Sequence, residues 1–442
     1  TMSPDTQAIA RGTGLTCQRV HTHLCRREAG QARAALESGE DVIVACGQEA
    51  PAFADLAESL GAEERLTCVD IRDRAGWSDD ANVGPKMAAL IAGARLNRPP
   101  VPALDVESAG VALVCGPADV VLPAAARLAG VLAVTCLVTD ADAVALPPAE
   151  IDAAEMDVVA GRIARLTGAL GGFAVEVADF ADLEPAGRGE RRFGPRRASA
   201  RSDCDLVVDL SGAPPPIPAA HKREGYLRAE PGDPVAVERV LFDAAQLVGT
   251  FEKPRYIRFT ESRCAHSRAR QTGCTRCLDV CPTGAIVPNG DHVALDPMIC
   301  AGCGNCAAVC PTGAALADAP PVESLFAEMQ AMAAAYRDAG GTAPRLLVHD
   351  GHGAEMIRLA ARFGRGLPAD VIPLPIESLG RFGHAEQLAA LGMGFAAVDI
   401  LAGPRTERAP LSAEIALAEA IATGASSDGH KGAPDGHQDA GT

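Results

Sequence analysis

Eight of the fifteen cysteines lie between Cys264 and Cys310, in two successive sets that are each followed by proline. The first set is Cys264, Cys274, Cys277 and Cys281, and the second set is Cys300, Cys303, Cys306 and Cys310. Iron–sulfur clusters are held by cysteine thiolates, and one bacterial pattern for them is C-x2-C-x2-C-x3-C-P. The second set matches this pattern in full. The sequence therefore predicts iron–sulfur clusters, and with them the chemistry of electron transfer.

The two cysteine sets belong to an internal repeat. The pattern C-x2-C-x3-C-P-T-G-A begins at Cys274 and recurs 29 residues later at Cys303. Between the two halves, apolar residues flank the turn residues Asn289 and Gly290, which predicts a β-hairpin. Proline after each fourth cysteine cannot continue a helix, and the glycine that follows permits a tight reversal of the chain.

The first ligand of the first set departs from the repeat. Regular spacing would place it at Gln271, whereas the nearest upstream cysteine is Cys264, nine residues before Cys274. We predict that Cys264 is a ligand and that residues 265–273 form a loop that brings its thiolate back. The alternative is a free thiol at Cys264 and a first cluster with three protein ligands. Zinc also binds paired C-x2-C motifs, but two complete C-x2-C…C-P sets favour iron.

Composition limits the class of protein. A chain of 442 residues has room for about three domains. Its formal net charge of −17 argues against a nucleic-acid partner. No apolar run reaches the roughly 20 residues of a membrane span, and the first twenty residues lack a signal-peptide core. Cysteine-rich metal ligation suits a reducing compartment, so we expect a cytoplasmic protein. Thr1 precedes Met2, which is consistent with a fragment of a longer protein.

Five other cysteines have no clear role. Cys46, Cys68 and Cys115 lie at or near the carboxyl ends of predicted strands, where α/β proteins bind ligands, but cysteine is also a common buried residue. Cys17 and Cys25 fit no metal-binding spacing. The sequence contains no nucleophile elbow, G-x-G-x-x-G motif or P-loop, so we predict no catalytic residue and no independent catalysis.

Residues 264–314 resemble the bacterial two-[4Fe–4S] ferredoxins. The resemblance implies two cubanes with crossed fourth ligands. The first cluster would take Cys264, Cys274, Cys277 and Cys310, and the second would take Cys300, Cys303, Cys306 and Cys281. Strands rich in Val, Ile and Leu alternate with helices on both sides of this segment. The predicted fold is therefore multidomain α/β, with a dicluster ferredoxin-like module inserted between two parallel-sheet α/β units.

These elements give a predicted division of the chain into five parts. They are an N-terminal α/β domain at 1–148, an irregular α/β continuation and linker at 149–250, the ferredoxin domain at 251–320, a C-terminal α/β domain at 321–425 and a disordered tail at 426–442. Residues 188–201, which carry six arginines, are expected to form an exposed basic loop.

A narrower resemblance concerns the large ferredoxin-type proteins of proteobacteria that accompany formate dehydrogenase. It is carried by the segments at 24–28, 45–51, 249–254, 264–268 and 273–277. It implies a redox protein partner, either formate dehydrogenase or its accessory proteins. One alternative is a non-redox maturation or scaffold protein for a molybdenum- or tungsten-dependent formate dehydrogenase. Another is a subunit of an oxidoreductase whose catalytic partner is a different chain.

A second, weaker resemblance is to the delta subunit of methyl-viologen-reducing hydrogenase, over residues 344–403. That family places cysteines after its strands, whereas this chain has none at 349–352, 375–377 or 402–403. The resemblance therefore implies the fold of this segment and no cluster in it.

The residues around the first cluster are basic in an otherwise acidic protein. Between Phe251 and Arg276 two acidic residues face seven basic ones, which are Lys253, Arg255, Arg258, Arg263, Arg268, Arg270 and Arg276. Such a face can steer an acidic redox partner or stabilise a reduced cluster. An ordinary solvated surface is the alternative.

Overall fold

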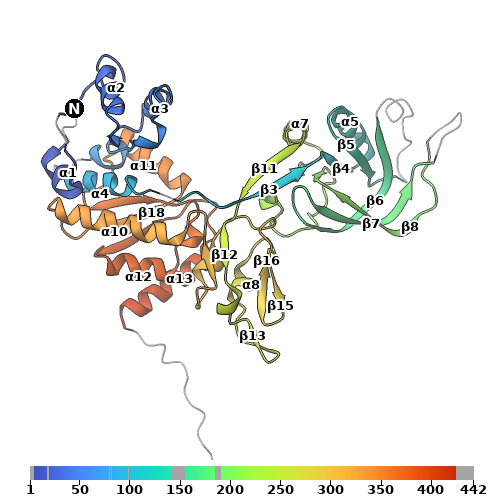
Figure 1. Cartoon of the computed structure of the whole chain (residues 1–442). Helices are drawn as coiled ribbons and strands as arrows, with labels where there is room; N and C mark the ends of the chain where they lie inside the picture. The colour runs from blue at the N-terminus through green and yellow to red at the C-terminus, as the bar shows by residue number, and fades with distance from the viewer. Residues whose placement is uncertain are drawn as a thin grey trace, which may run out of the picture. The chain divides into compact units, whose positions relative to one another are not determined.

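The computed structural model describes residues 4–16, 19–78, 80, 82–97, 99–141, 155–184 and 191–424. The chain divides into two compact units (Figure 1). Unit 1 consists of Thr1–Pro100, Cys303–Val309 and Pro320–Thr442, and unit 2 of Val101–Gly302 and Cys310–Ala319. The predicted tail at 426–442 lies outside the described residues. Among the helices that the structure describes, none has the length and apolar character needed to cross a membrane.

A three-stranded parallel sheet forms the centre of unit 1. Strand β18 (Arg345–His349) lies between β19 (Val371–Pro375) and β20 (Ala397–Leu401). Helices α11 (Gly351–Phe363) and α12 (His384–Gly392) make the crossovers. These elements agree with the sequence pattern, which predicts strands at 346–348, 371–374 and 395–401 and helices at 354–363 and around 387–391. The Asp350 side chain caps α11 by accepting a hydrogen bond from the Gly353 N–H at 3.0 Å.

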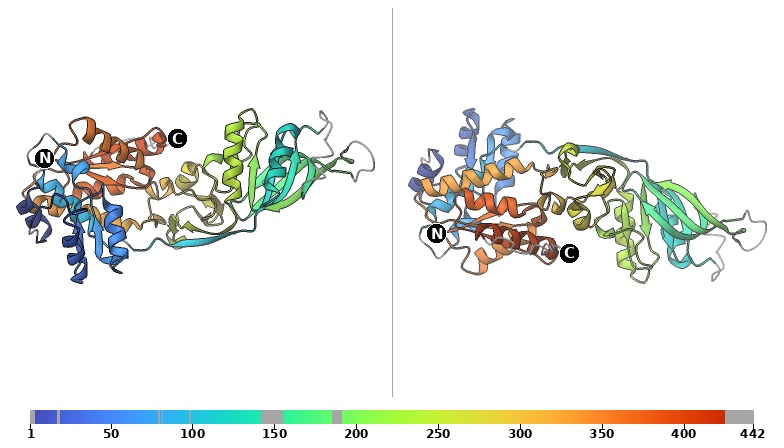
Figure 2. Two further views of the ribbon diagram at one scale, coloured as in Figure 1. Left: turned by 90° about the horizontal axis from the view of Figure 1, so that it is seen from above. Right: turned by 90° about the horizontal axis from the view of Figure 1, so that it is seen from below.

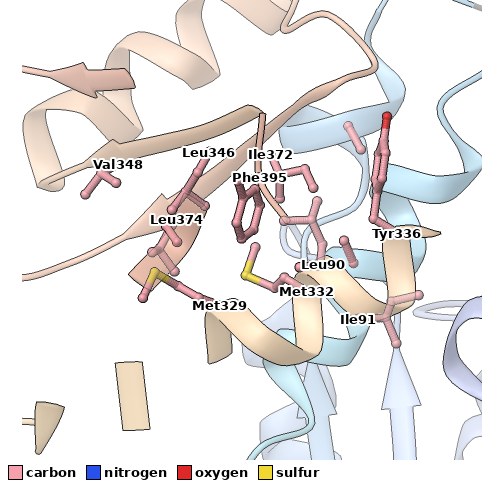
Figure 3. Close-up of a cluster of buried hydrophobic side chains, with 14 of the residues drawn as sticks. Leu90, Ile91, Met329, Met332, Tyr336, Leu346, Val348, Ile372, Leu374 and Phe395 are labelled. Carbon is pink, nitrogen blue, oxygen red and sulfur yellow. The ribbon is translucent and has the colours of Figure 1, made fainter. Parts of the chain in front are cut away.

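Two helices cover this sheet with apolar side chains. Helix α10 (Val322–Asp338) packs with α4 (Gly84–Ala94), and both contribute to one buried core with the sheet. Figure 3 shows Met329 and Met332 from α10 beside Leu346, Leu374 and Phe395. Helices α1 (Thr6–Thr13) and α13 (Arg408–Ala422) complete this part of unit 1. Because aromatic residues are scarce, methionine and aliphatic side chains fill the core.

The first two strands do not join the sheet that the sequence predicts. We expected strands at 41–46, 66–71, 111–115 and 131–138 to form one parallel sheet. Instead β1 (Val42–Val44) and β2 (Leu66–Cys68) pair with each other in unit 1, beside α2 (Ala29–Glu37) and α3 (Ala50–Glu58). The other two strands belong to unit 2. The two pairs of strands differ in burial. Strands β1 and β2 are short and mostly half-buried, whereas most residues of the two later strands are buried.

A seven-stranded sheet forms the centre of unit 2, and its first five strands run parallel. In spatial order these strands are β10 (Tyr226–Arg228), β9 (Leu206–Asp209), β4 (Val111–Gly116), β5 (Ala133–Val138) and β6 (Met156–Thr167). The sheet continues antiparallel through β7 (Phe173–Asp182) and β8 (Arg197–Cys204). The predicted basic loop at 188–201 is thus partly strand, and its residues 188–190 lie outside the described part.

Helices α5 (Ala118–Leu128) and α7 (Pro234–Ala245) lie on the same face of this sheet (Figure 2). Val114 and Val208 pack against these helices, whereas their neighbours Cys115 and Val207 belong to the core on the other face. This alternation is the two-residue period of a strand. The sequence predicts α7, and Asp233 caps it as expected. Strands β3 (Ala103–Ser108) and β11 (Gly249–Pro254) form a separate antiparallel pair.

The packing of unit 1 predicts a large effect of truncation at its central strand. Leu346 on β18 is fully buried, so Leu346→Ala should lower the free energy of unfolding by about 2–5 kcal/mol. Leu359→Ala on α11 is the matched control, because that leucine is 38% exposed and should cost about 1 kcal/mol or less. Denaturant unfolding followed by circular dichroism measures both, and equal losses would contradict this description of the core.

Candidate iron–sulfur site

Short antiparallel strands hold the cysteine-rich segment in unit 2. Strand β12 (Ile257–Phe259) pairs with β17 (Ala315–Ala317), and β15 (Ile286–Asn289) pairs with β16 (His292–Leu295). The second pair is the predicted Asn-Gly hairpin, with Gly290 at φ +67°. The glycines of the two Cys-Pro-Thr-Gly repeats, Gly284 and Gly313, have φ of +69° and +62°. Both repeats therefore reverse the chain through the same left-handed glycine conformation, as predicted.

The four cysteines predicted for the first cluster line a single pocket. Cys264, Cys274, Cys277 and Cys310 come from three separate stretches of chain, and the rest of the lining is largely apolar. Cys277 lies in the short helix α8 (Arg276–Val280). Burial and, after it, the neighbouring Cys274, Cys310 and Cys264 raise the pKa of Cys277 to about 11. This coupling shows that the four sulfurs are electrostatic neighbours.

A two-stranded ribbon brings Cys264 back to its partners. Residues 265–273 contain β13 (Ser267–Arg268) and β14 (Gln271–Thr272), which pair antiparallel. His266 closes the base of this ribbon: its carbonyl accepts hydrogen bonds from the N–H groups of Gly273 (2.7 Å) and Cys274 (3.3 Å). Its ring Nδ1 donates to the Cys274 carbonyl at 2.9 Å, and the ring is buried. His266 is thus a positioning residue that sequence reasoning missed.

Backbone N–H groups surround the Cys310 sulfur. The Ala315 N–H donates to Sγ at 3.4 Å, and the Thr312 hydroxyl lies 3.7 Å away. Burial raises the pKa of Cys310, but hydrogen bonds from Ala315, Thr312 and Ala314 outweigh it and the pKa is lowered. Hydrogen bonds to a thiolate stabilise its charged form, which is the form that binds metal.

The second predicted ligand set is divided between the two units, with Cys281 and Cys300 in unit 2 and Cys303 and Cys306 in unit 1. Burial raises the pKa of Cys300, and the nearby Cys281 raises it further. The N–H of Gly302 and the ammonium of Lys253 oppose this rise. Two of the four thiols of this set are therefore electrostatic neighbours within unit 2.

Cys306 lies in the short helix α9 (Asn305–Ala308), and Cys303 lies two residues before it. In unit 1 the Ser378 hydroxyl donates to the Cys303 carbonyl at 2.8 Å. Gly304, the residue immediately before α9, has φ +79°, and a Cβ there would meet the Arg381 Cβ at 2.5 Å. Only glycine fits this close approach, because both the backbone conformation and the contact exclude a side chain.

The residues of the first set fit a [4Fe–4S] cluster. Within the described residues, no three His, Cys, Asp or Glu side chains are close enough to share a single metal ion. The four thiols instead surround a pocket, and each would bind a different iron atom of a cubane. Thiolates that raise one another's pKa need cationic charge between them, and iron supplies it.

Comparison with known proteins agrees with this geometry. The model of the 4Fe-4S dicluster domain family matches residues 270–314, which include all the predicted ligands except Cys264. Residues 270–314 are therefore similar to a 4Fe-4S dicluster domain, and this segment is called the dicluster domain below. The curated proteins contain no match to the chain. The match supports iron–sulfur chemistry for this segment, and two clusters agree with the dicluster description.

The other cysteines lie outside the dicluster domain in the sequence. Cys25, Cys46 and Cys68 are half-buried and pack against the small core beside β1 and β2 in unit 1. Cys115 is fully buried in unit 2, where burial raises its pKa and its Sγ lies 3.5 Å from Asp209. Cys17 lies outside the described residues.

The basic residues around the first set separate into two groups. Arg255 and Arg258 form ion pairs with the buried Asp318, and Lys253 pairs with Glu224 at 2.7 Å. Arg263, Arg268, Arg270 and Arg276 are exposed. In the part of the chain that the structure describes, Arg268, Arg270 and Arg276 form no ion pair, and Arg276 borders the pocket of the four cysteines.

The pocket geometry predicts that Cys264 is a cluster ligand. Cys264→Ala should remove the first cluster and leave the second, so the iron content should fall by about half. Anaerobic iron and sulfide analysis, with electron paramagnetic resonance of the reduced protein, measures the loss.

The matched controls are cysteines outside the dicluster domain. Cys46→Ala and Cys17→Ala should leave both ferredoxin clusters intact. Full cluster content in Cys264→Ala would show that this residue is no ligand, and loss of a ferredoxin cluster in either control would contradict the assignment.

Proposed function

We propose that this protein transfers electrons through two [4Fe–4S] clusters. The observation that supports this most directly is the convergence of Cys264, Cys274, Cys277 and Cys310 in one pocket. The second cluster would be held by Cys281, Cys300, Cys303 and Cys306, on the sequence pattern. Each cluster, when bound, supplies reversible one-electron chemistry. The protein residues fix the cluster in place, exclude water and set the charge around it.

The setting that we propose for this electron transfer is formate oxidation, with formate dehydrogenase or one of its accessory proteins as the partner. The sequence resemblance at 249–254, 264–268 and 273–277 supports it. The exposed arginines beside the first set also support an acidic docking partner, because opposite charges steer association.

Metal content tests the cofactor assignment. Anaerobically purified protein should hold about eight iron and eight sulfide ions in the dicluster domain, because two cubanes contain four of each. Analysis of iron, zinc and acid-labile sulfide decides this. Four iron atoms, or zinc in stoichiometric amount, would be incompatible with two cubanes.

Redox behaviour separates the carrier from a scaffold for cluster assembly. Dithionite should reduce the clusters reversibly, and an oxidant should then restore the absorption spectrum of the oxidised protein without loss of iron. Clusters that never cycle, or that leave on incubation with an apo-dehydrogenase, would instead identify a maturation protein.

The exposed arginines predict a salt-dependent encounter with the partner. A triple variant in which Ser replaces Arg268, Arg270 and Arg276 should transfer electrons several-fold more slowly at low salt. The rate should also depend less on salt, and the cluster content should not change. Stopped-flow transfer to formate dehydrogenase at several ionic strengths measures the effect.

A control of equal charge change is available in the seven-stranded sheet. Arg162, Arg165 and Arg201 are exposed on β6 and β8, and their triple serine variant should keep the parent rate. If both triple variants behave alike, these arginines do not define a docking surface.

A further inference from the structure

A buried arginine lies beside the second ligand set in unit 2. Arg223 follows the short 3-10 turn Ala220–Lys222 and is only 6% exposed. Its Nη2 donates to the Thr283 carbonyl at 2.8 Å, within the Cys-Pro-Thr-Gly segment that begins at Cys281. Its Nη1 donates to the Gly168 carbonyl. Two carbonyls thus hold the guanidinium at the ligand segment.

The charge of Arg223 is not neutralised by a direct ion pair. Among the described residues, its hydrogen-bond acceptors are carbonyls, and its buried Nε has no partner. Asp296 interacts with it electrostatically but is exposed, so water screens that carboxylate. Burial lowers the pKa of Arg223, but a guanidinium stays protonated in proteins. Its full positive charge therefore acts on Cys281, with which it also interacts.

Lys253 provides a contrast at the other thiol of this set. It is 4% exposed and acts on Cys300, but its Nζ lies 2.7 Å from the Glu224 carboxylate. The ion pair offsets most of its field. At the first set, Arg276 borders the pocket but is exposed, so water screens its field. Arg223 is the buried cation beside these ligands without a carboxylate contact among the described residues.

We propose that Arg223 is a tuning residue that raises the reduction potential of the cluster bound by the second ligand set. Reduction adds one negative charge, and a buried positive charge nearby stabilises the reduced form more than the oxidised form. The proposal rests on the proposed function and adds to it a residue that favours entry of the electron at the second cluster.

The test is a potentiometric titration of the intact protein, monitored by electron paramagnetic resonance under anaerobic conditions. The midpoint of the second cluster is identified as the one that survives in Cys264→Ala. In Arg223→Met the reduced-to-oxidised ratio of this cluster at fixed potential should fall about tenfold, a shift of 59 mV for one electron. The midpoint of the first cluster should stay in place.

Conservative variants separate charge from structure. In Arg223→Lys the reduced-to-oxidised ratio of this cluster at fixed potential should stay within about threefold of the parent value, because the charge remains. Lys253→Met should shift it less than Arg223→Met, and Arg127→Met, an exposed arginine on α5, should not shift it. If Arg223→Met loses iron, Arg223→Gln replaces it and should lower the midpoint of the second cluster, because it keeps N–H donors for the Thr283 and Gly168 carbonyls but lacks the charge.

The outcomes divide clearly. An unchanged midpoint in Arg223→Met with full iron content overturns the proposal, as does an equal fall in Arg223→Lys. Where Arg223→Gln is the test, an unchanged midpoint with full iron content overturns it. A parent protein whose clusters never cycle would contradict the proposed function itself, which is a separate result.

Discussion

Four thiols that share one half-buried pocket repel one another as thiolates, and the dicluster domain depends on how this repulsion is offset. Burial and the neighbouring sulfurs raise the pKa of Cys277 to about 11, whereas N–H donors lower that of Cys310. Iron offsets the rest when it binds, so metal binding and folding are coupled in this segment. Such coupling matters where a short segment has a small apolar core, and the buried residues of this one include Ile286 and Val293.

Sequence reasoning succeeded where the chemistry is local. The spacing of the cysteines, the Asn-Gly hairpin and the alternating elements of 345–401 all follow from neighbouring residues. It did not predict that β1 pairs with β2 alone, or that Cys303–Val309 belongs to unit 1. Those features depend on contacts between distant stretches of chain, which periodicity does not encode. Arg223 escaped notice for the same reason, because it lies 41 residues before the first predicted ligand.

The two repeats share a backbone conformation but not an environment. Thr283 and Thr312 occupy equivalent positions, each beside its cysteine, and a left-handed glycine follows each. Backbone N–H dipoles offset the negative charge of a Cys310 thiolate, whereas the buried guanidinium of Arg223 lies at the Cys281 segment. A full charge in a low-dielectric site acts more strongly than a dipole. An internal repeat can therefore give two similar metal sites with different redox properties.

Burial also divides the positive charges of this acidic protein into two kinds. Exposed arginines such as Arg268 and Arg270 act across water, so their effect reaches a partner before contact and weakens with salt. A buried cation such as Arg223 acts through protein, so salt screens it little, and it acts on the ligands that it adjoins. If the proposed function holds, ionic strength should therefore change how fast an acidic partner associates without changing how readily the second cluster is reduced. The same charge thus has a different consequence according to the solvent around it.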